Sequence, residues 1–312
     1  MFGNKRYRTL NQEMKKIFGV KVIKLSVNGG FTCPNRNGVK GYKGCIFCSD
    51  SGGGDFAGNP DISISEQIDE QIALLSKKWK SERYIVYFGT FTNTYGDIEE
   101  LRKKYYEALY HPKVIGLAIA TRADCLSDDV IVLLRELNDI CFLWLEIGLQ
   151  TINQNTADFI RRGYDLSLFE DRFEQLKASN IKVVVHLILG LPGETREDIL
   201  KTVDYVSYIM PWGVKLHLLH IVQGTELETY FKNESKFRLL EMDEYVDLVC
   251  DCIERLPESI VIHRITGDGK KSDLVGPLWS LNKLKVISEI NKEMDHRNSL
   301  QGCRYESKYN AK

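Results

Sequence analysis

The 312-residue chain lacks the features that assign a sequence to several common protein classes. No apolar run approaches the roughly 18–20 residues of a membrane-spanning helix, and no apolar segment of a secretory signal follows the basic start M-F-G-N-K-R-Y-R. No G-x-G-x-x-G follows the first expected strand, and no Walker P-loop occurs. The eight cysteines lack regular spacing, so we expect a cytoplasmic protein without a disulfide framework or membrane contact.

Charge is distributed unevenly along the chain, although the net charge is only −1. Residues 1–48 hold ten Lys or Arg and one acid, Glu13, whereas the remaining chain holds 32 basic and 42 acidic residues. Such a basic stretch is either a solvated surface or a polyanion-binding margin beside the loop that follows it.

A glycine-rich loop from Asn28 to Asp50 carries three cysteines, Cys33, Cys45 and Cys48, in the spacing C-x11-C-x2-C. A structural zinc site needs four tetrahedral ligands, and no fourth ligand lies nearby in the sequence. A [4Fe-4S] cluster held by three cysteines leaves one iron open to a small molecule. The loop therefore favours a cluster, with zinc as the alternative.

Strand-like apolar segments alternate with amphipathic helical segments along the chain. Strands are expected at 20–27, 84–88, 114–120, 141–149, 181–189 and 214–221, with a shorter seventh at 259–265. Helices are expected at 65–79, 97–110, 127–137, 167–179 behind a Ser167-x-x-Glu170 capping box, from Thr195, at 242–256 and at 277–296. The alternation predicts an α/β fold with a parallel sheet, built as a partial (β/α)6 barrel.

Three regions are expected in this fold. Residues 1–19 form a basic N-terminal segment, residues 20–258 form the partial barrel, and residues 259–312 form a short C-terminal extension that closes the barrel mouth.

Polar residues cluster where the expected strands end, which is where such barrels place their chemistry. After or within strands two to six they are Gly89 and Thr90, Arg122 and Asp124, Glu146 and Gln150, His186 and Gly190, and Lys215 and His217. We expect these residues to reach towards a common mouth.

The segments L-E-I-G-L-Q-T, H-L-I-L-G-L-P-G-E-T and T-N-T-Y resemble the radical S-adenosylmethionine (radical SAM) enzymes, especially their elongator-like branch, over roughly residues 15–270. The first cysteine gap is longer than the superfamily's common C-x3-C-x2-C, as expected for that branch. The resemblance implies a radical SAM barrel in which Cys33, Cys45 and Cys48 bind three irons of a [4Fe-4S] cluster and SAM binds the fourth. It also implies a reducing electron donor of the flavodoxin or ferredoxin type.

The resemblance also implies residues that bind SAM. Phe47 would pack near the adenine, and Arg122 would pair with the carboxylate of SAM unless it pairs with Asp124. Glu146 would hydrogen-bond the ribose, since a buried acid without a partner is costly. The remaining candidates are Gly89, Thr90, Gln150, Arg161, His186 and Gly190. A core histidine is an equally good interpretation of His186, and an ordinary turn is an equally good interpretation of Gly190.

Five further residues are candidates for substrate binding, and the sequence names no catalytic residue. They are Arg162, Lys215, His217, Arg264 and Lys285. His217 and His220 are three positions apart on a strand and face opposite sides, so we expect no shared metal.

Within the elongator-like branch, the chain resembles a small bacterial subgroup tied to tRNA wobble-uridine modification. This implies radical conversion of 5-carboxymethylaminomethyluridine to 5-aminomethyluridine, with tRNA as a partner that the basic segment would contact. We expect no acetyl transfer, because no acetyltransferase region follows the barrel, and no sulfur insertion, because no second cluster motif occurs. A radical SAM enzyme for a small metabolite and a non-enzymatic, zinc-dependent RNA-binding protein stay open as alternatives.

Overall fold

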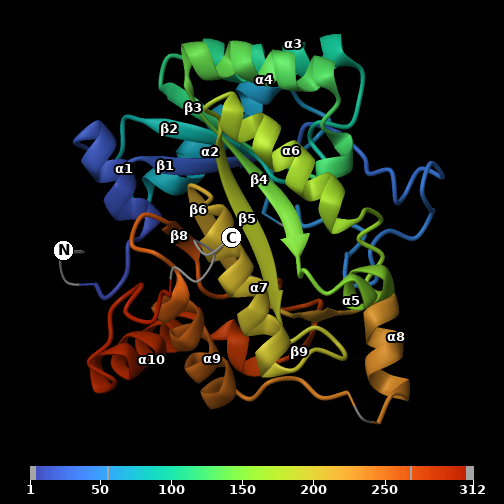
Figure 1. Cartoon of the computed structure of the whole chain (residues 1–312). Helices are drawn as coiled ribbons and strands as arrows, with labels where there is room; N and C mark the ends of the chain where they lie inside the picture. The colour runs from blue at the N-terminus through green and yellow to red at the C-terminus, as the bar shows by residue number, and fades with distance from the viewer. Residues whose placement is uncertain (1–4, 55, 236, 268, 307–312) are drawn as a thin grey trace.

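A curled, parallel β-sheet forms the centre of the computed structural model, which describes residues 5–306 except 55, 236 and 268 (Figure 1). Seven strands lie in the order β1-β2-β3-β4-β5-β6-β8. They are β1 (Ile23–Val27), β2 (Tyr84–Phe88), β3 (Val114–Thr121), β4 (Phe142–Gln150), β5 (Lys182–Leu189), β6 (Gly213–Leu218) and β8 (Val261–Arg264). The expected partial barrel is confirmed, and the short seventh strand belongs to it.

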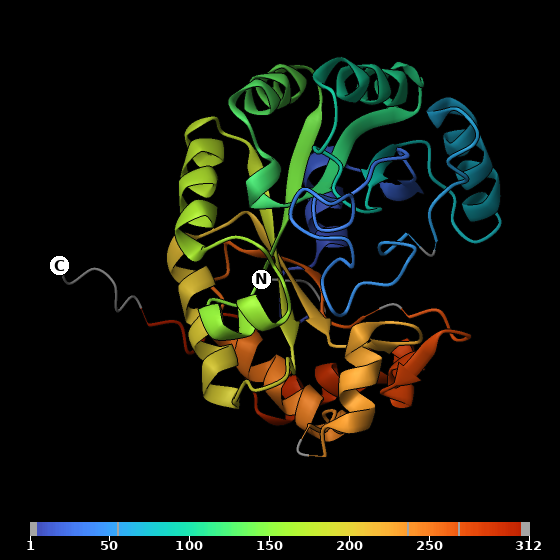
Figure 2. The ribbon, with the colours of Figure 1, turned by 90° about the vertical axis from the view of Figure 1, so that its right-hand side faces the viewer.

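Helices between the strands cover the outer face of the sheet, as Figure 2 shows from the end where the strands finish. They are α2 (Ile64–Ser76), α3 (Ile98–Tyr110), η1 (Ala123–Cys125), α4 (Asp128–Ile140), α5 (Gln154–Phe159), α6 (Leu166–Ala178), α7 (Arg196–Ile209) and α9 (Met242–Arg255). Buried apolar side chains such as Leu117, Leu145 and Val185 pack between sheet and helices. This burial is the main favourable contribution to folding.

Side-chain caps fix where several helices begin. The expected capping box of Thr195 and Asp198 is present at the start of α7. The box expected at Ser167 and Glu170 is wrong, because α6 already begins at Leu166 behind Asp165. Ser167 therefore lies inside the first turn of the helix.

A helix that was not among those expected, α1 (Leu10–Phe18), packs on the inner face of the half-barrel. Met14 of α1 packs against Ile85, Trp144 and Val184, which lie in the early parts of their strands. The helix therefore closes the end of the barrel where the strands start.

This position corrects the expected polyanion-binding margin beside the cysteine loop. β1 carries the chain through the barrel, so α1 and the loop after β1 lie at opposite ends of the strands (Figure 1). Arg6 pairs with Asp295, and Arg8 pairs with Glu13. Arg6 and Arg8 thus support the fold through ion pairs.

The chain after β6 forms short elements beyond the sheet. They are β7 (Ile221–Val222), α8 (Glu226–Asn233), β9 (Leu274–Gly276), η2 (Leu278–Leu281) and α10 (Lys283–His296). The strand expected at 214–221 is thus interrupted, and the helix expected at 277–296 is divided into η2 and α10. β7 and β9 pair antiparallel next to the end of β6, whereas α10 packs on α9.

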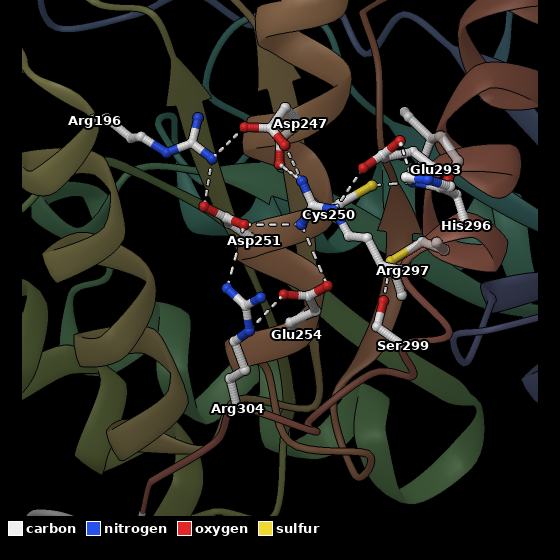
Figure 3. Close-up of polar contacts among 12 residues, drawn as sticks. Arg196, Asp247, Cys250, Asp251, Glu254, Glu293, His296, Arg297, Ser299 and Arg304 are labelled. Atoms are coloured by element: carbon white, nitrogen blue, oxygen red, sulfur yellow. Dashed lines mark hydrogen bonds and ion pairs between the residues drawn. The ribbon is translucent and has the colours of Figure 1, made fainter.

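An ion-pair network joins α10 to α9, as Figure 3 shows. Arg297, the residue after α10, lies 2.9 Å from Asp251 Oδ1 and 3.2 Å from Glu254 Oε1 through its Nη1 atom. It also pairs with Asp247, which binds Arg196 of α7. The network fixes the C-terminal helix against the barrel. No helix in the described part of the chain is long and apolar enough to cross a membrane.

Candidate active site

The cysteine loop lies over the end of the half-barrel where the strands finish (Figure 2). The side chain of Asn35 holds it by donating to the carbonyl oxygen of Arg161 at 2.7 Å and to the sulfur of Cys45 at 3.5 Å. Arg36 donates to the carbonyl oxygens of Cys48 and Ser49 at 2.9 and 2.6 Å. These bonds anchor the loop before any cofactor binds.

All three loop cysteines are free thiols of intermediate exposure. Among the residues that the structure describes, no three His, Cys, Asp or Glu side chains lie close enough together to hold a metal ion. A structural zinc ion takes four ligands, whereas a [4Fe-4S] cluster held by three cysteines keeps one iron open. Three thiols in one anchored loop therefore fit a cluster better than a zinc ion.

Positive charge surrounds these thiols. Burial raises the pKa of Cys45 to about 11, and the charge of Cys48 adds to this, whereas the charge of Arg122 lowers it. Metal binding needs the thiolate form, which nearby cations favour. Arg122 and Arg36 therefore support the charge that a loaded site would carry.

Arg122 forms a two-bonded ion pair with Asp124, at 2.9 Å from Nε to Oδ1 and 2.8 Å from Nη2 to Oδ2. Lys40 from the cysteine loop lies 2.6 Å from Asp124 Oδ2. The Arg122–Asp124 ion pair, which the sequence offered as the alternative to a SAM contact, is therefore present and buried. Two of the Arg122 donors are already used, which leaves Nη1 for the expected contact with the SAM carboxylate.

Polar atoms without hydrogen-bond partners lie near the ends of three strands. Within the described residues, Thr90 Oγ1, Gln150 Oε1 and His217 Nε2 are buried and unpaired. Such atoms are costly unless a ligand or water meets them. Gln150 also has a φ of +66°, at a register shift in β4. These atoms fit a site that is completed by a bound cofactor or substrate.

The glycine run after the cysteine loop packs closely on the end of β2. A Cβ on Gly54 would lie 2.4 Å from Thr90 Oγ1, and one on Gly52 would lie 2.2 Å from the Phe91 ring. Gly52 has a φ of +59° as well. Only glycine lets the loop approach the strand end at these positions.

Glu146 is fully buried on the inner face and bound by four side chains. Trp144 Nε1 donates to Oε1 at 3.0 Å, and Lys24 lies 3.6 Å from the same oxygen. His186 Nε2 lies 3.0 Å from Oε2, to which Lys215 also donates. Burial alone would raise the pKa of Glu146, but Lys215 and Lys24 hold it well below its usual range. The acid therefore has partners, which removes our reason for expecting a ribose contact.

His186 and His217 continue this polar group along β5 and β6, with ring centroids 5.0 Å apart. Burial lowers the pKa of His186 to about 4, and the charge of Lys215 contributes, so the ring is neutral at pH 7. The charge of Arg264 also reaches His186. Lys215, His217 and Arg264, all substrate candidates, thus lie on one side of the half-barrel.

Arg162 has a structural role instead of the expected substrate contact. Its guanidinium group donates to the carbonyl oxygens of Tyr164, Leu149 and Thr151 at 3.0, 3.0 and 2.7 Å. The side chain is buried and fixes the turn after β4. The sequence could not predict this role, because every residue has a backbone carbonyl and the acceptors of Arg162 therefore cannot be recognised from residue types.

Lys285 is also misplaced as a substrate candidate. It is exposed on α10, which packs on α9 at the lower left of Figure 1, whereas the cysteine loop lies on the right. Lys285 was expected near the barrel mouth because it follows the last expected strand in the sequence. The chain forms β9 and η2 before it reaches α10, and these elements carry Lys285 away from the mouth.

Four further SAM candidates are Phe47 in the cysteine loop, Arg161 beside it, and Gly89 and Gly190 directly after β2 and β5. Phe47 packs against the apolar group of Ile160 and Leu219. Arg161 places its carbonyl beside Cys45, while its guanidinium group pairs with Glu226. Gly190 has a φ of +90°, and Leu240 would lie 3.2 Å from a Cβ there. Gly89 precedes Thr90 directly after β2.

Sequence reasoning missed two inner-face residues, Lys24 and Tyr87. Lys24 lies in the basic stretch of residues 1–48, yet its ammonium group lies 3.8 Å from the Tyr87 ring centroid inside the barrel. The alternation of side chains along a strand could have revealed their direction. The neighbours of Lys24 and of Tyr87 in their strands face the helices, so these two side chains must face the inside of the barrel.

Comparison with known proteins gives two family matches. The Radical SAM superfamily matches residues 30–206, and the Radical_SAM C-terminal domain matches residues 211–296. The Bacillus subtilis protein YtqA is 43% identical over 298 residues, which cover 96% of this chain and 92% of YtqA. Elongator complex protein 3 of Homo sapiens is 28% identical over 163 residues, covering 50% of this chain and 28% of that protein.

A solved structure, the archaeal Methanocaldococcus infernus Elp3, shares the fold with a TM-score of 0.69 and 18% identity. It matches 90% of this chain, which spans 64% of the Elp3 chain. The anchored cysteine loop, the curled parallel sheet and the family matches agree. The chain therefore belongs to the radical SAM superfamily and is a radical SAM enzyme with elongator-like relatives.

Proposed function

We propose that this enzyme converts 5-carboxymethylaminomethyluridine at the wobble position of tRNA to 5-aminomethyluridine. The observation that carries the proposal is the charged inner face of the half-barrel, where Lys24, Lys215 and His186 meet Glu146. Such a face does not suit an apolar substrate, but it suits a base whose side chain bears an amine and a carboxylate. The identity of that base comes from the resemblance of the sequence to the elongator-like subgroup tied to wobble-uridine modification.

The cofactors of the family fit the residues present. Cys33, Cys45 and Cys48 would hold three irons of a [4Fe-4S] cluster, and the unpaired atoms of Thr90 and Gln150 are suited to binding SAM. Together the reduced cluster and SAM supply a 5′-deoxyadenosyl radical that takes a hydrogen atom from a substrate carbon. The barrel residues orient the substrate and exclude water.

The overall reaction balances with water as the second reactant. SAM, the carboxymethylaminomethyl base and water give methionine, 5′-deoxyadenosine, the aminomethyl base and glyoxylate. The substrate would lose two electrons, and SAM would be the oxidant that takes them up, so a flavodoxin- or ferredoxin-type donor would provide no net electrons. The oxygen atom of water ends in the aldehyde group of glyoxylate.

A folded tRNA is too large to enter a half-barrel of one small domain. The anticodon base would have to leave its stack to enter, as bases do in other enzymes that modify them. Contacts to the RNA backbone would then come from the rim around the cysteine loop. The exposed Lys43 of that loop is a candidate for such a contact.

Nucleoside mass spectrometry of tRNA from a strain lacking the gene tests this proposal. We expect the carboxymethylaminomethyl nucleoside to accumulate, and the purified, cluster-loaded enzyme to form glyoxylate and 5′-deoxyadenosine from that tRNA. An unchanged nucleoside profile together with no tRNA-dependent 5′-deoxyadenosine would overturn the tRNA substrate in favour of a small metabolite.

A further inference from the structure

Lys24 lies in β1, yet its ammonium group crosses the inside of the half-barrel to Glu146 in β4, with 3.6 Å between Nζ and Oε1. β2 and β3 separate these strands in the sheet, so the contact exists only because the sheet curls. The ammonium groups of Lys24 and Lys215 lie 3.8 and 4.9 Å from the Tyr87 ring centroid. Two cations and one carboxylate thus share one small polar space.

The two lysines differ in their contact with Glu146 and in the exposure of their side chains. Lys215 donates directly to Glu146, and its side chain is only 3% exposed, whereas that of Lys24 is 26% exposed. At 3.6 Å the Lys24 contact is longer than a hydrogen bond. Glu146 is meanwhile met by Trp144 and His186, each at 3.0 Å. Lys24 is therefore the more accessible of the two cations and the less tightly bound.

Polar groups connect this space to the strand ends. His186 is 16% exposed and lies between Glu146 and His217, whose Nε2 atom is buried and unpaired. Gln150 Oε1 at the end of β4 is unpaired as well. A ligand that reached Lys24 from the strand ends would meet these hydrogen-bonding groups, which would compensate its loss of hydration.

The charge of the space favours an anion. Burial lowers the pKa of Lys24, Glu146 opposes this, and the charge of Arg264 lowers it further. A negative group beside Lys24 would stabilise its protonated form, because opposite charges in a poorly solvated site attract strongly.

We propose that Lys24, supported by the Lys215–Glu146 pair, is a specificity-determining residue that binds a carboxylate group of the substrate inside the half-barrel. The proposal rests on the proposed function for the identity of that group, the carboxymethyl carboxylate of the modified uridine. Removal of the group then leaves a product that Lys24 no longer holds, which favours product release.

Two substrates and matched variants test the role of Lys24. The cluster-loaded Lys24→Gln, Lys24→Arg and Lys16→Gln proteins are compared with the wild type on tRNA bearing the carboxymethylaminomethyl base and on tRNA bearing its neutral amide. Lys16 is exposed on α1 and serves as the control for loss of one lysine charge. KM and kcat are measured separately, and circular dichroism verifies folding.

We expect Lys24→Gln to raise KM for the acid about 10- to 100-fold and to change KM for the amide little, since a charge-assisted contact is lost. Lys24→Arg should keep part of the preference for the acid, and Lys16→Gln all of it. If Lys24→Gln turns over the acid with the wild-type KM, the carboxylate site is wrong while the proposed function stands.

Binding of N-methylglycine, a fragment with the same carboxymethylamino group, gives a measurement that does not depend on tRNA turnover. Saturation-transfer NMR should detect the fragment on the wild-type and Lys16→Gln proteins and not on Lys24→Gln. Fragment binding that needs Lys24, without conversion of any tRNA, would support the carboxylate site and overturn the wobble-uridine substrate. No difference between the wild type and Lys24→Gln would overturn the carboxylate site.

Discussion

Lys215 in β6 donates its ammonium group to the Glu146 carboxylate in β4, across the inner side of β5, and both side chains are buried. The pair joins strands that are not neighbours in the sheet. It therefore supports the curl of the half-barrel as well as the charge balance of its interior.

Loss of either partner should destabilise the protein strongly. We expect Lys215→Met and Glu146→Gln each to lower the free energy of unfolding by about 3 kcal/mol, because a buried charge loses its partner. The double variant should lose clearly less than the sum of the two. Urea unfolding of the four cluster-free proteins measures this, and additive losses would show that the residues are energetically independent.

The cluster ligands are tested by their iron content. Cys33→Ala, Cys45→Ala and Cys48→Ala should each lose the brown colour and absorbance near 400 nm after anaerobic reconstitution, a family expectation, and should not cleave SAM. Cys303→Ala is the matched control, because Cys303 is exposed and lies outside the loop. Wild-type SAM cleavage by any of the three loop variants would contradict the assignment.

Arg162 and Arg161 should behave differently although they are adjacent. Arg162→Lys removes the fork that binds the Tyr164, Leu149 and Thr151 carbonyls, so we expect a loss of about 2–4 kcal/mol in unfolding free energy. Arg161→Lys keeps a cation near Glu226 at a half-exposed site and should cost less than about 1 kcal/mol. Thermal denaturation compares them. Equal stability of the two variants would argue for a functional instead of a structural Arg162.

Arg297 should be the key residue in the contact between α9 and α10. Arg297→Ala leaves Glu254 and Asp251, 0% and 13% exposed, without this partner. We expect a loss of about 2–3 kcal/mol in unfolding free energy. Arg304→Ala removes a 58% exposed arginine from the same acids and should cost under about 1 kcal/mol. Chemical denaturation that ranks the two variants in the opposite order would refute this assignment.

Glu194 should make stability fall as pH rises. Burial raises the pKa of its carboxyl group from 4.5 to about 7, although Thr151 donates to it. Between about pH 4.5 and 7 the unfolded chain releases this proton first, so the folded state loses stability in that window. We expect Glu194→Gln to gain about 1–3 kcal/mol over the wild type between pH 5 and pH 8. A difference independent of pH would show that the raised pKa is absent.

The strands were predictable because each is a short, continuous run of apolar residues. Tyr84–Phe88 matches its expected bounds, and Val114–Thr121 and Lys182–Leu189 differ from theirs by one residue. We did not expect α1, although Leu10, Met14 and Phe18 lie at helical spacing behind a Thr9–Gln12 capping box, because the basic charge is the more conspicuous feature of residues 1–19. The sequence also grouped Lys24 with the other cations of residues 1–48, because the composition of a basic stretch does not show which way each side chain points.

The sequence by itself determined the cysteine loop, the alternation of strands and helices and the resemblance to radical SAM enzymes. Spacing and periodicity are properties of the chain, so they need no fold to be recognised. Only the tertiary structure decided that Lys24, Glu146 and Lys215 meet, that Arg162 binds backbone, and that α1 lies far from the loop. Contacts across a curled sheet depend on which strands become neighbours and on how far the sheet bends.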